Sequence, residues 1–126
     1  MKKANVLLVD DEALVLSGWK FSLESAGYRV KTALSGDDAI SMIEDEKPDI
    51  VFTDLVMPRM NGVEVCRNIK AMHPDIEVVL VSGHPAEIDK HLMDFLKAGG
   101  KDVYLRKPLF KEEIIEAAGK IIKMKE

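Results

Sequence analysis

The sequence holds a single cysteine, Cys66, among its 126 residues. A lone thiol excludes an internal disulfide, and a reducing cytoplasm is therefore the expected location. Long apolar runs are absent as well, since no stretch approaches the ~18 residues that span a bilayer. The apolar run behind Met1-Lys2-Lys3 stops at Asp10, which is too short for a secretory signal. We therefore expect no membrane segment and no export signal.

An excess of basic residues is also missing. Lysine and arginine number 18 against 22 aspartates and glutamates, which gives a net charge of −4, and the two signs are interspersed. Because a surface that follows nucleic-acid phosphates needs clustered Lys and Arg, this chain is not expected to bind nucleic acid directly. The composition, 47% hydrophobic and 32% charged, is that of a globular protein. The length predicts one domain over residues 1–126.

Apolar segments of two kinds alternate along the chain. Short runs rich in β-branched residues predict strands at Asn5–Val9, Tyr28–Ala33, Ile50–Thr53, Ile76–Val81 and Val103–Leu105. Segments with apolar residues every three or four positions predict one helix that ends at Gly27, one from Ser35 to Lys47, and others at Val63–Met72, Glu87–Ala98 and Lys111–Met124. This alternation predicts an α/β, flavodoxin-like three-layer sandwich, (βα)5, whose parallel sheet has the order 2-1-3-4-5.

Polar residues stand at the carboxyl ends of the predicted strands: Asp10-Asp11, Asp54, Ser82 and Lys107. Because these strand ends share one edge of an open α/β sheet, we expect the side chains to meet. Neighbouring acids raise one another's pKa unless a cation offsets their charge. Mg²⁺ with oxygen ligands fits, whereas zinc would favour His or Cys. The pattern predicts that Asp54 accepts a phosphoryl group, with Lys107 and Ser82 contacting that group.

The ordered set of motifs resembles the receiver domain of two-component response regulators. The matching residues are Asp10-Asp11, Asp54, Met57-Pro58, Asn61-Gly62, Ser82, Tyr104 and Lys107-Pro108. The resemblance implies that Asp54 takes its phosphoryl group from a phosphohistidine of a sensor histidine kinase or a phosphotransfer protein. It also implies that Asp11, Asp54 and the backbone carbonyl of Val56 hold Mg²⁺, with Asp10 acting through water. Lys107 would contact the phosphoryl group, and Lys107-Pro108 would be a cis peptide.

The resemblance implies a switch too. Ser82 would shift toward the phosphate and Tyr104 would turn inward, which would reshape the face of the fourth helix, fifth strand and fifth helix that a downstream protein or an output domain reads. Val56 and His84, two residues after Asp54 and Ser82, would flank the path of the attacking water and set the lifetime of the phosphate. The segment 98–104 is one residue longer than the usual family run into the aromatic. This leaves open the loop's shape and the detail of the switch. The sequence is equally consistent with a free-standing domain and with part of a longer regulator.

Other interpretations remain beside these. In isolation, Asp10-Asp11 could cap a helix, Ser82-Gly83 could form a turn, and Tyr104 could be structural. A Mg²⁺-dependent aspartyl-phosphate phosphohydrolase commonly carries a second acid two residues after the nucleophile, where this chain has Val56. A flavin-binding module needs a Ser/Thr/Gly phosphate cradle after the first strand, where Asp10 and Asp11 would repel a phosphate. We therefore expect a phosphoacceptor signalling domain that catalyses only its own phosphorylation and dephosphorylation, and not an enzyme acting on other substrates.

Overall fold

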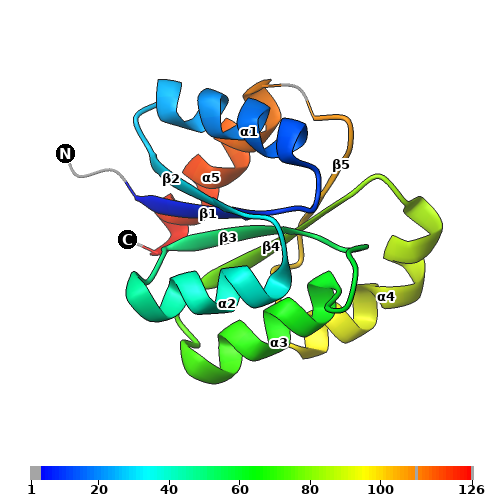
Figure 1. Ribbon diagram of the computed structural model, residues 1–126. Helices are drawn as coiled ribbons and strands as arrows, with labels where there is room; N and C mark the ends of the chain where they lie inside the picture. The colour runs from blue at the N-terminus through cyan, green and yellow to red at the C-terminus, as the bar shows by residue number, and fades with distance from the viewer. Residues whose placement is uncertain (1–3, 110, 126) are drawn as a thin grey trace.

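The computed structural model describes residues 4–109 and 111–125, and these form one parallel sheet between two layers of helices. The strands are β1 (Asn5–Val9), β2 (Arg29–Ala33), β3 (Ile50–Asp54), β4 (Glu77–Ser82) and β5 (Tyr104–Arg106). The helices are α1 (Ala13–Ser25), α2 (Gly36–Asp45), α3 (Gly62–Met72), α4 (Pro85–Lys97) and α5 (Lys111–Lys125). The sheet order is β2-β1-β3-β4-β5. Figure 1 shows α1 and α5 on one face and α2, α3 and α4 on the other. The predicted (βα)5 fold and sheet order are confirmed.

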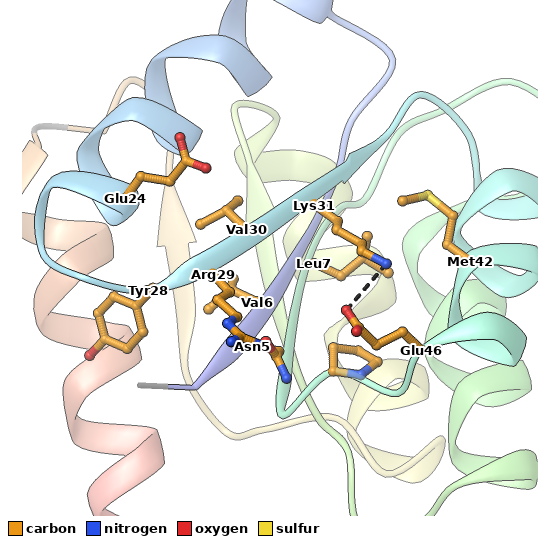
Figure 2. Close-up of a pocket in the computed structure, with 11 residues that line it drawn as sticks. Asn5, Val6, Leu7, Glu24, Tyr28, Arg29, Val30, Lys31, Met42 and Glu46 are labelled. Carbon is orange, nitrogen blue, oxygen red and sulfur yellow. Dashed lines mark ion pairs between the residues drawn. The ribbon is translucent and has the colours of Figure 1, made fainter. Parts of the chain in front are cut away.

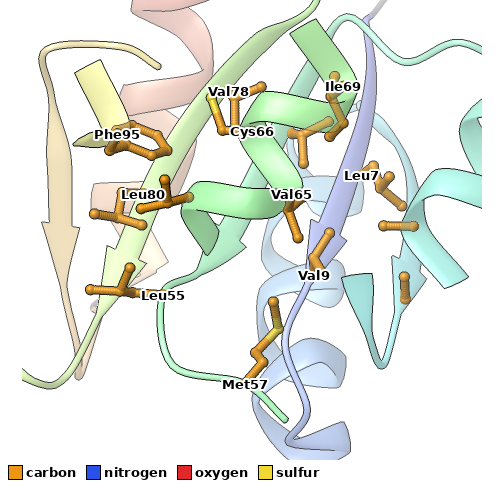
Figure 3. Close-up of a cluster of buried hydrophobic side chains, with 14 of the residues drawn as sticks. Leu7, Val9, Leu55, Met57, Val65, Cys66, Ile69, Val78, Leu80 and Phe95 are labelled. Atoms are coloured by element: carbon orange, nitrogen blue, oxygen red, sulfur yellow. The ribbon is translucent and has the colours of Figure 1, made fainter. Parts of the chain in front are cut away.

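Each face of the sheet has its own hydrophobic core. Under α2, α3 and α4, the strand residues Val78 and Leu80 pack with helix residues such as Phe95 (Figure 3). Under α1 and α5, Phe52 of β3 packs with side chains that include Trp19. Residues 50–54 of β3 are all buried. Because each large apolar side chain contributes roughly 1.5–3 kcal/mol on burial, β3 is held firmly at the centre of the sheet.

The helix ends follow local sequence. Ser35 caps α2 as predicted, since its Oγ accepts the backbone N–H of Asp38 at 3.1 Å. Gly27, with a φ of 97°, lets the chain turn after α1. Helix α4 begins at Pro85, two residues before the predicted start. Proline suits the first turn of a helix, where its missing N–H has no partner to lose.

Strands β2 and β4 each begin one residue later than predicted. The N–H of Tyr28 donates to the carbonyl of Leu23 and so completes the end of α1, which leaves β2 to start after it. The N–H of Ile76 donates to the carbonyl of His73 within a turn, so β4 starts at the next residue and ends at Ser82. Both differences arise because a local hydrogen bond takes a donor that an isolated apolar pattern assigns to the sheet.

The segment before β5 contains a bulge. The register of β4 and β5, continued backward, would bring the N–H of Val103 to the carbonyl of Val78. Instead Lys101, two residues earlier, donates to that carbonyl at 2.9 Å. Val103 is looped out and 48% exposed, so β5 starts at Tyr104 and not at Val103. The longer segment in the sequence is thus accommodated by a bulge just before β5, at the edge of the sheet.

A cavity of about 390 Å³ lies beside edge strand β2, near the amino ends of β1 and β2 (Figure 2). Its charged lining includes the pair Lys31–Glu46, with 3.2 Å between Nζ and Oε1 and both side chains half exposed. Exposed pairs of this kind contribute little energy and no special chemistry. Neither Asp10 nor Asp54 lines this cavity. The predicted chemistry therefore lies at the opposite ends of the strands.

Within the described residues, no helix has the length and apolar character needed to cross a membrane.

Candidate functional site

Two buried aspartates lie side by side at the carboxyl edge of the sheet. Asp10 directly follows β1, and Asp54 is the last residue of β3, the strand that pairs with β1. Asp10 is 0% exposed and Asp54 is 4% exposed. The parallel pairing of Val9 with Thr53 places the two carboxylates next to each other in register. Sequence order separates these residues widely, and the strand order brings them together as predicted.

Lys107 reaches this pair from the end of the edge strand β5. It follows β5, and its backbone N–H donates to the carbonyl of Ser82 at 3.0 Å. Its Nζ lies 2.5 Å from Oδ2 of Asp10 and 3.4 Å from Oδ2 of Asp54. Oε1 of Glu12 lies 3.7 Å from the same nitrogen. The peptide between Lys107 and Pro108 is cis, as expected. One ammonium group is therefore shared among three carboxylates, two from the segment after β1 and one from the end of β3.

The acids carry more negative charge than Lys107 offsets. Burial, and then the charge of Asp10, raise the pKa of Asp54 to about 6, although Lys107 and the N–H of Leu55 oppose this. Burial also raises the pKa of Asp10 despite its hydrogen bond to Lys107. Burial lowers the pKa of Lys107, but the hydrogen bond to Asp10 and the charge of Asp54 outweigh this and raise it. A further cation at this edge would relieve the remaining repulsion.

The oxygen atoms at this edge fit a hard divalent cation. Carboxylate oxygens of Asp10, Asp11 and Glu12 lie within 4.8 Å of one another, and the latter two residues are exposed. The N–H of Glu12 donates to Oδ1 of Asp10 at 2.9 Å, which orients the buried carboxylate. Oxygen donors together with surplus negative charge suit Mg²⁺. Asp54 is outside this group of three but, like Asp10, contacts Lys107.

Sequence reasoning did not assign a role to Glu12, although it closes the acidic run after β1. Its position near both the acid cluster and Lys107 makes it part of the charged environment of the site. Three consecutive acids were a signal that could have indicated it. Whether the second or third acid of such a run turns toward the sheet edge depends on the entry into α1, which the residue pattern alone does not give.

The remaining predicted residues surround the site at different depths. Ser82 is 1% exposed, and its Oγ accepts the N–H of His84 at 3.1 Å. His84 itself is exposed, and Val56 is 41% exposed just after the buried Leu55. Tyr104 lies on edge strand β5 and is 40% exposed. Ser82 is thus buried at the strand end, whereas Val56, His84 and Tyr104 are accessible from solvent.

The loop after Asp54 is braced against the first turn of α3. Asn61 and Glu64 form a capping box, in which Oδ1 of Asn61 accepts from the N–H of Glu64 at 3.0 Å and Oε1 of Glu64 accepts in return at 3.1 Å. The N–H of Gly62 donates to the carbonyl of Leu55 at 2.9 Å. The Asn-Gly motif therefore shapes the loop that follows the aspartate.

Replacing Asp54 with asparagine is expected to stabilise the fold at neutral pH. The folded pKa of about 6 lies above the ordinary value of 3.8, so ionisation costs stability as pH rises from about 4 to 6. Allowing for partial solvent screening, Asp54→Asn should raise the free energy of unfolding by about 1–2 kcal/mol at pH 7.5, with the gain vanishing near pH 4. Urea unfolding without metal measures this. Asp89→Asn, on the exposed surface of α4, serves as control, and a less stable Asp54→Asn at pH 7.5 would contradict the account.

Comparison with known proteins agrees with this geometry. The family model described as "Response regulator receiver domain" matches residues 6–119. A response regulator receiver domain protein from Clostridium thermocellum is similar at 32% identity, with 97% of this chain and 96% of that chain covered and a TM-score of 0.87. A CheY-like receiver domain protein from Methanospirillum hungatei JF-1 has 25% identity over 98% and 97% of the two chains, with a TM-score of 0.91. NtrX from Brucella abortus has 28% identity and a TM-score of 0.88, with 98% of this chain but 28% of NtrX covered. The chain belongs to the family of response regulator receiver domains of two-component systems.

Proposed function

We propose that this receiver domain accepts a phosphoryl group on Asp54 from a phosphohistidine of a sensor histidine kinase or a phosphotransfer protein, in a Mg²⁺-dependent reaction. The observation that carries the proposal is the position of the buried Asp54 carboxylate, 3.4 Å from the Lys107 ammonium and beside the acids that follow β1. A carboxylate beside an ammonium and a hard-cation site is suited to forming an aspartyl phosphate.

In the proposed transfer, an oxygen of Asp54 attacks phosphorus while the bond from phosphorus to the histidine nitrogen breaks. The pKa of about 6 leaves this carboxylate largely ionised at neutral pH and thus nucleophilic. The Lys107 ammonium, already shared between Asp10 and Asp54, turns toward the phosphoryl oxygens as charge moves onto them. Asp11, Asp54 and the Val56 carbonyl would hold Mg²⁺, with Asp10 acting through water, and the ion when bound supplies positive charge to the phosphoryl oxygens.

The proposed signal begins at Ser82. Its hydroxyl would donate to a phosphoryl oxygen once Asp54 is modified, and its hydrogen bond from the N–H of His84 would be rearranged. Tyr104 would turn inward from its exposed position on β5, and the face formed by α4, β5 and α5 would change shape. A downstream protein or an output domain would read that face as a shift between two packings. The chain matches only 28% of the longer NtrX, which is compatible with an output domain as the reader of this face.

The direct test is intact-mass measurement after incubation with acetyl phosphate. Wild-type protein with Mg²⁺ is expected to gain one phosphoryl mass, since acetyl phosphate can replace the protein donor. Asp54→Asn should gain none, and wild-type protein with a chelator should gain little, because the repulsion among the acids is then left uncompensated. Equal uptake by Asp54→Asn would disprove the role of Asp54, and absence of uptake by wild-type protein with Mg²⁺ would reject the function.

The rival function, an aspartyl-phosphate phosphohydrolase, lacks support at one position. Val56 stands where such an enzyme commonly places its general acid, and a valine side chain can neither donate nor accept a proton. We propose that the domain catalyses only its own phosphorylation and dephosphorylation, so a chromogenic phosphomonoester should not be turned over.

We also propose a cytoplasmic location, where a free, buried thiol such as Cys66 is usual.

The lifetime of the phosphate is expected to depend on Val56 and His84. Both side chains are accessible and lie two residues beyond Asp54 and Ser82. Val56→Gln would place an amide where it can orient the attacking water, which should speed loss of the acyl phosphate by roughly tenfold. Following the phosphorylated mass after removal of the donor measures this rate. Leu34→Gln, at an exposed position after β2, is the control, and identical rates in all three proteins would reject the role of Val56.

A further inference from the structure

The Lys107 ammonium has an aromatic neighbour as well as its acids. Its Nζ lies 5.6 Å from the centroid of the Trp19 ring, within the range of a cation–π interaction. Trp19 is the single tryptophan of the chain and is 8% exposed, while the Lys107 side chain is 17% exposed. The contact is therefore largely shielded from water, which strengthens attraction between an ammonium and a ring face.

The surroundings of Trp19 fix its ring in this place. Trp19 comes from the buried side of α1 and belongs to the hydrophobic core that α1 and α5 cover. It lines a cavity of about 570 Å³ together with Lys107, Leu14, Pro108 and Leu109. The ring is thus anchored in the core, with the Lys107 Nζ lying over it. Because a lysine stem has four rotatable bonds, a fixed neighbour restricts where its ammonium can lie.

The indole of Trp19 and the carboxylates interact with the ammonium in different ways. Asp10 and Asp54 bind it through hydrogen bonds and offset its charge, whereas a ring face attracts it without accepting a conventional hydrogen bond or carrying a net charge. The ammonium therefore keeps its N–H groups for oxygen atoms. A leucine could fill part of the same volume but has no such ring face.

We propose that Trp19 is a positioning residue for Lys107, holding the ammonium where it can pass from the carboxylates of Asp10 and Asp54 to an incoming phosphoryl group. The inference rests on the proposed function of Asp54 and adds a residue that the receiver-domain motifs of this sequence do not include. Trp19 touches neither phosphoryl group nor donor and acts through Lys107. The competing interpretation is that Trp19 only fills the core.

A first experiment tests the contact without phosphorylation. In NMR spectra recorded without Mg²⁺, the ε-methylene protons of Lys107, assigned by their loss in Lys107→Arg, are expected upfield of ordinary lysine values because the ammonium next to them lies over the Trp19 ring. Trp19→Leu should abolish this shift, and Trp19→Phe should retain part of it. Ordinary lysine shifts in the wild-type protein would overturn the inference.

A second experiment tests the consequence for the reaction. With acetyl phosphate and saturating Mg²⁺, Trp19→Leu should slow phosphoryl uptake roughly five- to tenfold, while Trp19→Phe should stay within about twofold of wild type. Both variants remove volume at the same point, leucine somewhat more than phenylalanine, so a packing effect alone would leave only a small difference between them. Ile121→Val, in the same core on α5, should not change uptake. Should Trp19→Leu not fold, Trp19→Met provides the same contrast with Trp19→Phe.

The outcomes separate the inference from the function beneath it. Uptake by wild type with equal rates in the aromatic and aliphatic variants overturns the role of Trp19 and leaves Asp54 as acceptor. Absence of uptake by wild type removes the proposed function, and the positioning role with it. Slow uptake by Trp19→Leu together with near wild-type uptake by Trp19→Phe supports both the positioning role of Trp19 and the function of Asp54.

Discussion

Replacing Lys107 with methionine is expected to lower the free energy of unfolding by about 3 kcal/mol at pH 8. Methionine keeps most of the unbranched stem but leaves Asp10 and Asp54 buried without their shared ammonium, 2.5 and 3.4 Å away in the native protein. The pKa values of both acids are already raised, by burial first. Without Lys107 they should rise further, so the loss of stability grows as pH increases above about 4 and both acids ionise in the unfolded state. At pH 4.5 the loss should shrink to about 1 kcal/mol.

Titration of Lys107 itself limits its stabilising effect at high pH. Its folded pKa is raised, so its contribution is present below the ordinary value of 10.5 and is lost as pH rises through the folded value. Urea unfolding at pH 4.5 and pH 8 without metal measures both proteins. Lys101→Met is the matched control, because Lys101 contacts Glu77 at 2.7 Å but both side chains are partly exposed. If Lys107→Met is no less stable than Lys101→Met at pH 8, the shared ammonium is not needed to balance the acids.

Mg²⁺ should reduce the difference in stability between wild type and Lys107→Met. Lys107 and a bound cation compete for the same carboxylates, so removing the lysine should tighten Mg²⁺ binding. Saturating Mg²⁺ is then expected to recover part of the stability lost in Lys107→Met and to stabilise wild type less. An equal gain in both proteins would indicate that cation and lysine use separate acids.

Gly62→Ala is expected to cost about 2 kcal/mol of stability through steric conflict. A Cβ at this position would lie 2.6 Å from the carbonyl oxygen of Asp54 and 3.0 Å from Cα of Leu55. Both are backbone atoms, so no side-chain rotation relieves the conflict. The first turn of α3 would have to move away from the end of β3, and the hydrogen bond from the N–H of Gly62 to the Leu55 carbonyl would lengthen.

Gly18→Ala is the matched control for this prediction. Gly18 lies within α1, and a Cβ there meets nothing within 4 Å, so alanine should raise stability by about 0.5–1 kcal/mol through its better helix propensity. Urea unfolding measures both variants. Gly62→Ala should also slow uptake from acetyl phosphate, because the displaced backbone carries the acceptor. Wild-type stability and uptake in Gly62→Ala would contradict the claim that α3 is seated directly on the end of β3.

The architecture could be predicted because the sequence signals for it are local and repeated. Apolar runs and helical periodicity define the elements, and the rules for parallel sheets then order the strands. This places Asp10, Asp54 and Lys107 at one edge although they are distant in sequence. The same rules do not say which donor takes a given carbonyl. The N–H of Lys101, and not that of Val103, takes the Val78 carbonyl, and nothing in the residue types distinguishes the two.

Side-chain partners across elements were the other limit. Trp19 has the spacing of an ordinary core residue, and the helical pattern that predicts its burial gives no information about Lys107, which arrives from the opposite end of the chain. Glu12 likewise belongs to an acidic run whose members turn in different directions once α1 begins. Contacts of this kind depend on how segments distant in sequence pack together, whereas the sequence pattern describes each segment separately.

The most direct measurement is to locate the phosphoryl group itself. Protein treated with acetyl phosphate and Mg²⁺ is reduced with borohydride, which converts an aspartyl phosphate to homoserine, and its peptides are then mapped by mass spectrometry. We predict conversion at Asp54 alone, dependent on both donor and Mg²⁺. Conversion at Asp10 or Asp11, or a phosphorylated protein in which Asp54 stays unmodified, would contradict the account.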